Sequence, residues 1–246
     1  MNWIIGLALA GGLSLYATPP KSALDLTIEN CQKPLLVELS KAESLTDFVS
    51  QEIEKSRLNF YLGRCAFIEK ESSISIPFFE QGEKNAENAL ELKNDEPVAL
   101  FWWAANKGVL ADIYRSLSAL KTVKLIETKM LLIRDKNPDY GFLGADRILG
   151  KLYQKAPRFI SIGSSSKAEE CLKRAYEKFP KFPGNIIALA EFYDDDGRLE
   201  EAKKVLLPLV DSQQIQKGDY GPFNVEKQEW DKIVTALIEK WRPKGE

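Results

Sequence analysis

Apolar residues recur at intervals of three and four along most of this 246-residue chain, and this period constrains the fold more than any other feature. Such spacing places apolar side chains on one stripe of a helix. The clearest run extends from Leu45 to Ile68, whereas the only strand-like alternation, Ser73 to Ile76, stops at Pro77. The sequence therefore predicts an all-α chain of about ten helices. Besides that first run, we expect helical segments near residues 79–93, 97–108, 110–135, 142–155, 167–179, 184–195, 199–211 and 225–241.

The predicted helices fall into pairs that repeat one pattern of large and small residues. Leu189 and Ala190 are followed by Tyr193, and small or apolar residues recur on the next helix. This spacing is typical of tetratricopeptide repeats, in which small residues let the paired helices approach each other closely. We expect an all-α, tetratricopeptide-like superhelix of about four helix pairs plus flanking helices, with an irregular helical bundle as the alternative. The other copies begin at Leu149-Gly150, at Leu62-Gly63 and, in an uncertain register, within Pro97 to Val123.

Residues 1–17 resemble a secretory signal. Trp3 to Leu15 is a run of thirteen uncharged residues. A run of this length is too short to span a bilayer but suits the apolar part of a signal. Ala17 offers a small residue for cleavage, so we expect an exported protein whose mature chain begins near Thr18. A buried N-terminal helix is the alternative, although three glycines in the run disfavour it. No cysteine follows the run closely, so a lipid anchor is not expected.

Residues 18–246 are expected to form a single helical-repeat domain. It comprises N-terminal helices within 22–50, repeats over about 51–211 and a C-terminal helix at 224–242. The domain keeps three cysteines. In an oxidising compartment the favoured disulfide joins Cys31 to Cys65. The third cysteine, Cys171, is expected to be a buried hydrophobic residue rather than a reactive thiol.

The composition excludes several classes of chemistry. The chain has no histidine, so Ser-His-Asp triads, Cys-His pairs and histidine-ligated metal sites are ruled out. A net charge of -2 argues against electrostatic binding of nucleic acid. Ser164 and Lys167 have the Ser-x-x-Lys spacing of some hydrolases, but Ser166 with Glu169 also fits a helix capping box, and we favour the structural interpretation. We therefore expect a non-enzymatic protein without metal or cofactor.

The stretch Asp146 to Pro157 resembles the R-x-L-G-x-x-Y-x-x-A-P stretch of the T component associated with TRAP transporters. Further likeness lies in the aromatic segment Ala99 to Asn106 and in Glu191 to Ala202, so that the resemblance covers about residues 50–212. It implies a periplasmic tetratricopeptide protein that binds a solute-binding protein as its partner. Members of that family are usually lipid-anchored, and this chain departs from them by lacking the anchor cysteine.

The repeat register assigns candidate ligand-binding residues to the concave face of the superhelix. The positions in the first three copies combine aromatic and basic side chains, which suits a small organic anion with an apolar body. Glu191 and Asp194 make the last copy acidic. The alternative is that the aromatic residues are ordinary core and that Arg147 makes internal ion pairs, in which case Arg147→Ala would lower stability rather than ligand affinity alone. The candidates are Phe60, Arg64, Phe67, Phe101, Trp102, Asn106, Arg147, Lys151 and Gln154.

Two functions from different classes remain open. The first is a transport accessory that holds a solute-binding receptor in the periplasm and passes a small apolar acid to it. The second is a generic interaction scaffold that binds a peptide or helix of another protein. An envelope assembly factor held by an uncleaved N-terminal segment is a lesser alternative. Phe223, Trp230 and Trp241 are expected either to cap the repeat or to form an interface between copies of the chain.

Overall fold

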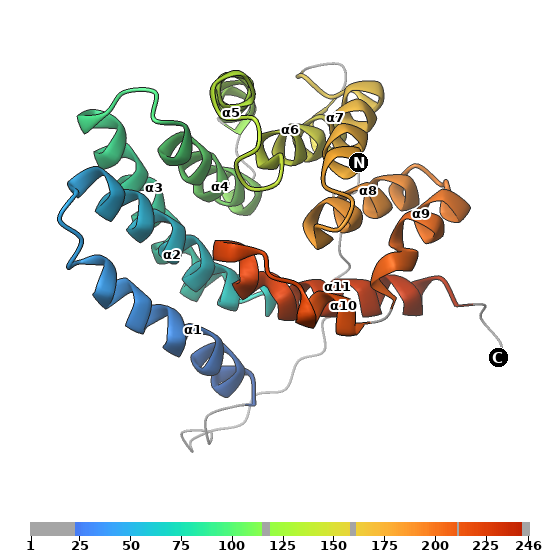
Figure 1. Ribbon diagram of the computed structural model, residues 1–246, viewed down its shortest axis with the longest axis horizontal. Helices are drawn as coiled ribbons and strands as arrows, with labels where there is room; N and C mark the ends of the chain where they lie inside the picture. The colour runs from blue at the N-terminus through green and yellow to red at the C-terminus, as the bar shows by residue number, and fades with distance from the viewer. Residues whose placement is uncertain (1–22, 115–118, 158–160, 211, 243–246) are drawn as a thin grey trace, which may run out of the picture.

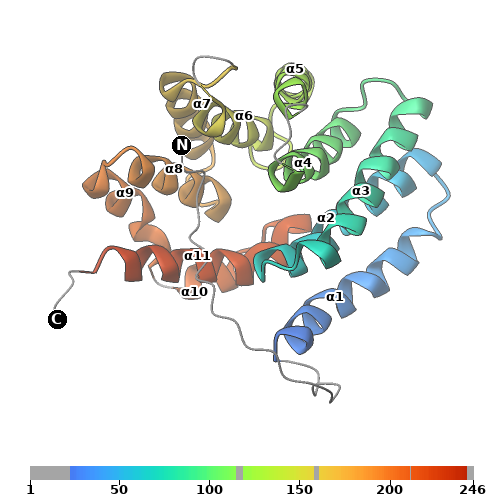
Figure 2. The same cartoon turned by 180° about the vertical axis from the view of Figure 1, so that it is seen from behind.

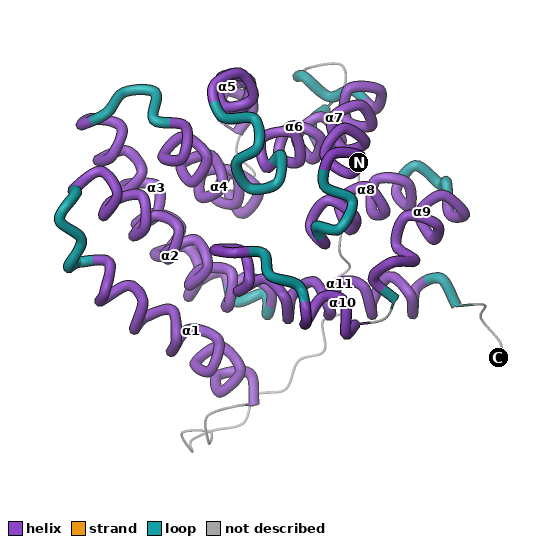
Figure 3. Tube along the Cα trace, in the orientation of Figure 1, coloured by secondary structure: helices purple, strands orange, loops and turns teal. Residues whose placement is uncertain are grey.

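The computed structural model describes residues 23–114, 119–157, 161–210 and 212–242. The proposed signal, residues 1–17, lies outside this part of the chain. In the described residues, helices are joined by short loops and no strand occurs, as Figure 3 shows. The prediction of an all-α fold is therefore confirmed. The elements are α1 (Ala23–Ala42), α2 (Phe48–Ile68), α3 (Ser72–Leu92), α4 (Pro97–Tyr114), α5 (Ala119–Lys136), α6 (Gly144–Lys155), α7 (Ser165–Lys178), α8 (Pro183–Asp195), α9 (Leu199–Leu206), η1 (Leu207–Leu209), α10 (Ser212–Lys217), η2 (Gly221–Glu226) and α11 (Lys227–Lys240).

Successive helices pack as antiparallel pairs, α2 with α3, α4 with α5, α6 with α7 and α8 with α9. Figures 1 and 2 show that α1 to α9 follow one another along an arc, with α10 and α11 beside its inner side. A single buried apolar cluster extends through the arc and includes Leu62, Trp102, Leu149 and Trp230. The C-terminal helix is thus part of the same core as the repeats.

Small residues bring the helices of a pair together, as the repeat pattern predicts. A Cβ atom built on Gly63 would lie 2.8 Å from the Phe79 ring on the partner helix. A Cβ atom on Gly150 would lie 2.5 Å from Leu172. Both distances are below van der Waals contact, so only glycine permits the observed approach. Gly197, with a φ of +77°, ends the turn between α8 and α9, where a left-handed conformation favours glycine.

Several predicted boundaries differ from the structure. The alternating stretch Ser73 to Ile76 is helical, and Pro77 lies inside α3. Ser75 is buried in that turn, so packing decides the conformation against the local alternation. Helix α4 continues through Gly108 to Tyr114 instead of ending at residue 108, because its next turn buries Leu110. The N-cap of α7 is Ser164, two residues before the predicted Ser166.

The predicted disulfide is confirmed. Cys31 and Cys65 are bonded, with their Cα atoms 5.8 Å apart, and the bond ties α1 to α2. Cys171 is free and buried in α7. Burial raises the pKa of its thiol to about 11, so the reactive thiolate is disfavoured, in line with its predicted role as a core residue. None of the helices that the structure describes is long and apolar enough to cross a membrane.

Candidate functional site

The concave face of the repeats, formed by α2, α4, α6, α8 and the loop before α6, is occupied by the protein's own C-terminal segment, residues 221–241. Arg57 of α2 donates a hydrogen bond to the Pro222 carbonyl at 3.1 Å. At the other end, the Trp241 indole donates to Asp194 of α8 at 2.9 Å. The C-terminal segment therefore bridges the first and last repeats, as its course in Figure 1 shows.

A tight turn delivers this segment to the groove. Gly221, the first residue of η2, has a φ of +56° and precedes Pro222. The Asp219 carboxylate accepts hydrogen bonds from the Gly221 amide at 3.1 Å and from the Asn224 side chain at 2.9 Å. Asn224 in turn accepts from the Tyr220 amide at 2.9 Å. These local bonds fix the turn and direct the next side chain, Phe223, into the protein.

Phe223 fills an aromatic socket formed by Trp102, Tyr140, Phe142 and Phe182. Its ring is 3% exposed and lies 5.9 to 6.4 Å from the four other rings, centroid to centroid. The Trp102 ring stacks on it with an interplanar angle of 23°. Such ring pairs add to the free energy gained by burying apolar surface. Phe223 is therefore an apolar anchor of the C-terminal segment, and the buried Trp230, whose ring lies 5.2 Å from that of Phe182, is another.

The loop that lines the socket has an unusual backbone. Gly141, Phe142 and Leu143 all have φ values between 56° and 61°. This left-handed conformation costs a non-glycine residue about 1–2 kcal/mol. A Cβ atom on Gly141 would lie 3.1 Å from the Phe223 ring, so a side chain there would crowd the socket. The protein thus maintains a strained loop at the place where the socket forms, which is typical of a functional position.

Arg147 holds this loop in place. Its guanidinium donates hydrogen bonds to the Gly141 carbonyl at 3.0 Å and to the Asn185 amide oxygen at 2.7 Å. It also lies 4.9 Å from the centre of the Phe182 ring. Asn185 donates to the Phe142 carbonyl at 3.0 Å. Arg147 therefore orders the walls of the socket, whereas its predicted contact with a ligand stays a prediction.

Two carboxylates of the C-terminal segment meet the polar part of the groove. The Tyr61 hydroxyl donates a hydrogen bond to Glu226 at 2.8 Å, and Arg64 forms an ion pair with Glu229. Burial raises the pKa of Glu226, although the charges of Arg147 and Arg64 and a hydrogen bond from Tyr61 oppose this shift. Burial similarly lowers the pKa of Arg64 and Arg147. Ionisation of Glu226 therefore costs more free energy in the folded protein than in water.

Two more of the predicted site residues pair with the acidic positions of the last repeat. The Lys151 ammonium lies 2.5 Å from Glu191, and the Gln154 amide donates to Asp195 at 2.8 Å. Both contacts join α6 to α8 along the concave face. Both side chains thus have partners within the chain itself, and the ion pair between Lys151 and Glu191 links the basic third copy to the acidic fourth copy.

The remaining candidates lie in the aromatic core around the socket. Phe60 packs 5.6 Å from Trp102 and 5.9 Å from Phe79, while Phe67 lies 6.1 Å from Phe79. Phe101 is buried and packs edge-on against Trp102 at 5.1 Å. These contacts correspond to the alternative interpretation of the aromatic residues as core. Their role in binding a ligand stays a prediction.

Asn106 is placed differently, since it is fully buried between α2 and α4. Its amide donates to the Trp102 carbonyl at 2.8 Å and to the Ser56 hydroxyl at 3.3 Å. A Cβ atom built on Gly82 would lie 2.4 Å from the Asn106 side chain, so α3 covers it closely. The contacts of Asn106 therefore tie three helices together.

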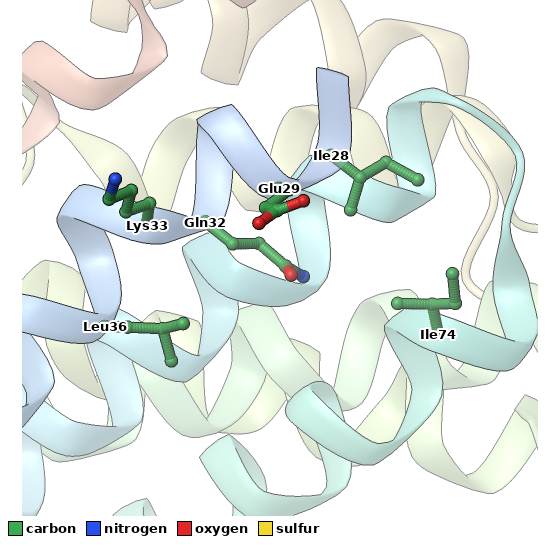
Figure 4. Close-up of a pocket in the computed structure, with 6 residues that line it drawn as sticks. All are labelled: Ile28, Glu29, Gln32, Lys33, Leu36 and Ile74. Carbon is green, nitrogen blue, oxygen red and sulfur yellow. The ribbon is translucent and has the colours of Figure 1, made fainter. Parts of the chain in front are cut away.

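Features that suggest other sites have structural explanations. The Ser164 hydroxyl accepts a hydrogen bond from the Lys167 amide, so it caps α7. Asp194 in the acidic turn pairs with Lys240. The described residues include no group of three or more potential metal ligands. An open cleft of about 370 Å³ lies between α1 and α3, where Figure 4 shows Ile74 across from residues of α1, among them Leu36. Nothing in its lining indicates a particular ligand.

Repeat register did not assign Phe223, Glu226 and Glu229 to the groove. The sequence predicted only that the aromatic residues near the C-terminus cap the repeat or form an interface, and in the structure Phe223 and Trp230 are both buried against the repeats. A usable signal was present in the spacing of side chains in the C-terminal segment. It carries an aromatic residue followed by glutamates three and six residues later, and the first three copies of the predicted groove are aromatic and basic. Such complementarity indicates a contact.

Comparison with solved structures identifies the architecture. The chain is similar to the crystal structure of a thermophilic TPR protein from Thermus thermophilus. The TM-score is 0.54 and the sequence identity is 15%, over 85% of this chain and 99% of that chain. The fold is a tetratricopeptide-like helical repeat. No protein-family model and no curated protein matches the sequence, so the likeness establishes the fold and not a narrower family.

Proposed function

We propose that this tetratricopeptide-like protein is a non-enzymatic scaffold that binds a segment of another protein on its concave face. The observation that carries the proposal is the groove itself. It already holds a protein segment, through the aromatic socket around Phe223 and the arginine that meets Glu229. Helical-repeat proteins use such concave surfaces for extended protein contacts. The groove is therefore better suited to a peptide or helix than to a free small molecule.

We further propose that the protein acts in the cell envelope. The uncharged run from Trp3 to Leu15 supports export. The disulfide between Cys31 and Cys65 supports an oxidising compartment, because such bonds are rare in the reducing cytosol. Both observations concern location and are independent of what the groove binds.

A TRAP-type transport accessory is the second candidate function. The stretch from Arg147 to Pro157, which resembles the T component of these transporters, supports it. This stretch comprises most of α6 and begins at the arginine that orders the socket. In this case the partner would be a periplasmic solute-binding protein. The socket and the nearby arginines would then also suit a small apolar acid.

The decisive experiment is capture of partners from an envelope extract with the full-length tagged protein, followed by mass spectrometry. The test variant carries Arg64→Glu in the groove. The matched control carries Lys41→Glu on α1, where the lysine side chain is 66% exposed. A partner that the wild type and Lys41→Glu retain and Arg64→Glu loses supports groove binding. A solute-binding receptor in that position would support the transport role. Equal capture by all three proteins would refute binding on the concave face.

A further inference from the structure

The C-terminal segment presents its groove-facing side chains at a regular spacing. Phe223, Glu226 and Glu229 are three residues apart and lie on one face of the η2–α11 turn. Each meets a different part of the concave face. Phe223 enters the aromatic socket, Glu226 accepts the hydrogen bond from Tyr61, and Glu229 pairs with Arg64. The contacts have the form of a bound peptide that is read at three positions.

Apart from the packing of Phe182 against Trp230, the walls of the socket are held by contacts that do not involve this segment. The Trp102 indole donates to the Tyr140 hydroxyl at 2.8 Å, and the Phe142 and Phe182 rings stack 4.2 Å apart. Arg147 and Asn185 hold the left-handed loop through its carbonyls. The walls of the socket are therefore supported by the repeats themselves. A preorganised site of this kind binds its ligand at a smaller entropic cost.

The segment is held less firmly at its polar positions than at Phe223. Val225, the neighbour of Glu226 in the chain, is exposed. The ionised carboxylate of Glu226 is costly in this position, since burial raises its pKa despite the nearby arginines. The ion pair between Lys240 and Asp194 at the end of α11 involves a lysine that is 60% exposed, and such pairs contribute little. Apolar contacts of Phe223, Trp230, Val234 and Leu237 therefore hold the segment, and a competing segment has to displace these together with several weaker polar contacts.

We propose that the C-terminal segment is an intramolecular occupant of a peptide-binding groove, and that the partner presents an aromatic residue followed by carboxylates three and six residues later. This inference rests on the proposed scaffold function and specifies the chemistry of its partner. The partner's aromatic ring replaces Phe223 in the socket. Its carboxylates replace those of Glu226 and Glu229 opposite Tyr61 and Arg64.

The test uses a fluorescent peptide with the sequence of residues 219–232 and full-length protein. In the wild type the resident segment competes with the peptide, whereas Phe223→Ala in the protein weakens the resident segment only. We expect the peptide to bind the Phe223→Ala protein roughly tenfold or more tightly than the wild type. A peptide that itself carries Phe223→Ala should lose at least as much affinity. Equal binding of the peptide to both proteins would overturn the proposal.

A charge reversal separates recognition from damage to the fold. Arg64→Glu, added to the Phe223→Ala protein, should lower the affinity for the wild-type peptide by roughly tenfold or more, because the new glutamate repels the two carboxylates of the peptide. A peptide carrying Glu229→Arg should recover most of that loss on the same protein. Failure of this recovery would overturn the assignment of Arg64 to the partner's carboxylate. If Phe223→Ala does not fold, Glu229→Arg in the full-length protein serves as the variant with a weakened resident segment, since it replaces the ion pair with Arg64 by two like charges.

Two other occupants have distinct outcomes. In a competition experiment with only part of the protein occupied by peptide, displacement of the peptide by 3-phenylpropanoate would assign the socket to a small acid and overturn the peptide proposal. Dimerisation of the wild type in analytical ultracentrifugation, abolished by Phe223→Ala, would assign the groove to a second copy and overturn it as well. If envelope capture finds a groove-dependent partner but the peptide does not bind, the scaffold function stands and only this inference fails.

Discussion

Replacing Phe223 by alanine should shift the C-terminal segment toward its open state while leaving the repeats folded. The ring is 3% exposed and is enclosed by the rings of Trp102, Tyr140, Phe142 and Phe182. Burial of about 150 Å² of a phenylalanine side chain at about 25 cal/mol per Å² contributes about 4 kcal/mol. Measured Phe→Ala costs are about 3–5 kcal/mol. We therefore expect a loss of about 3–4 kcal/mol in the free energy that holds the segment closed.

Amide hydrogen exchange measures this loss locally. A change of about 3–4 kcal/mol corresponds to a roughly 150- to 850-fold shift of the opening equilibrium. Protection of the α11 amides should fall by about that factor, while the buried amides of α2 and α3 keep theirs. Leu207→Ala is a suitable control, because this side chain is 68% exposed and should leave α11 unchanged. Loss of protection throughout α2, α3 and α11 together would show that the segment is an inseparable part of the core and would refute the reasoning.

Three further predictions concern the supports of the fold. Replacing Cys31 and Cys65 by serine should lower the free energy of unfolding by about 4 kcal/mol, because a disulfide that closes a loop of 34 residues restricts the unfolded chain by about that amount. Chemical denaturation of the wild type and the double variant in oxidising buffer measures the difference, and equal midpoints for the two proteins would contradict the prediction. The pKa of Glu226 is raised in the folded protein, so the free energy of unfolding should fall as the pH increases from about 4.5 through the pKa of the folded state. Glu226→Gln should flatten this dependence of stability on pH, as measured by urea denaturation between pH 4 and pH 8. Arg147→Ala should lower the free energy of unfolding by about 2–4 kcal/mol, because it removes hydrogen bonds to Gly141 and Asn185, and an unchanged melting temperature would contradict a structural role for Arg147.

The sequence predicted the repeat architecture because its signals are local. Helical period, proline and glycine breaks, and small residues such as Gly63 and Gly150 all act within a helix or between neighbours in the chain. The disulfide also followed from few alternatives, since only three cysteines were available. Local rules failed where packing overrode them. Ser73 to Ile76 became helical because α3 buries Ser75 and Phe79 against its neighbours.

The composition of the groove was readable from the sequence, but its occupant was not. Repeat register placed Arg64, Trp102 and Arg147 in or beside the concave region, and the structure places Trp102 and Arg147 at the socket and Arg64 opposite Glu229. It did not show that Lys151 and Gln154 would be satisfied by Glu191 and Asp195. Those pairings depend on how far each repeat rotates relative to the next, which a pattern within one repeat does not encode.

What the sequence by itself determined is an all-α repeat with a concave face rich in aromatic and basic residues. Only the tertiary structure decided that Phe223, Glu226 and Glu229 fill that face. Tyr61 and Glu226 are 165 positions apart in the chain. Contacts of such separation depend on the curvature accumulated over all the repeats and on the turn at Gly221, where φ is +56°. The physical reason is that helix formation follows from spacing along the chain, whereas closure of the groove follows from the summed geometry of every helix pair between its two ends.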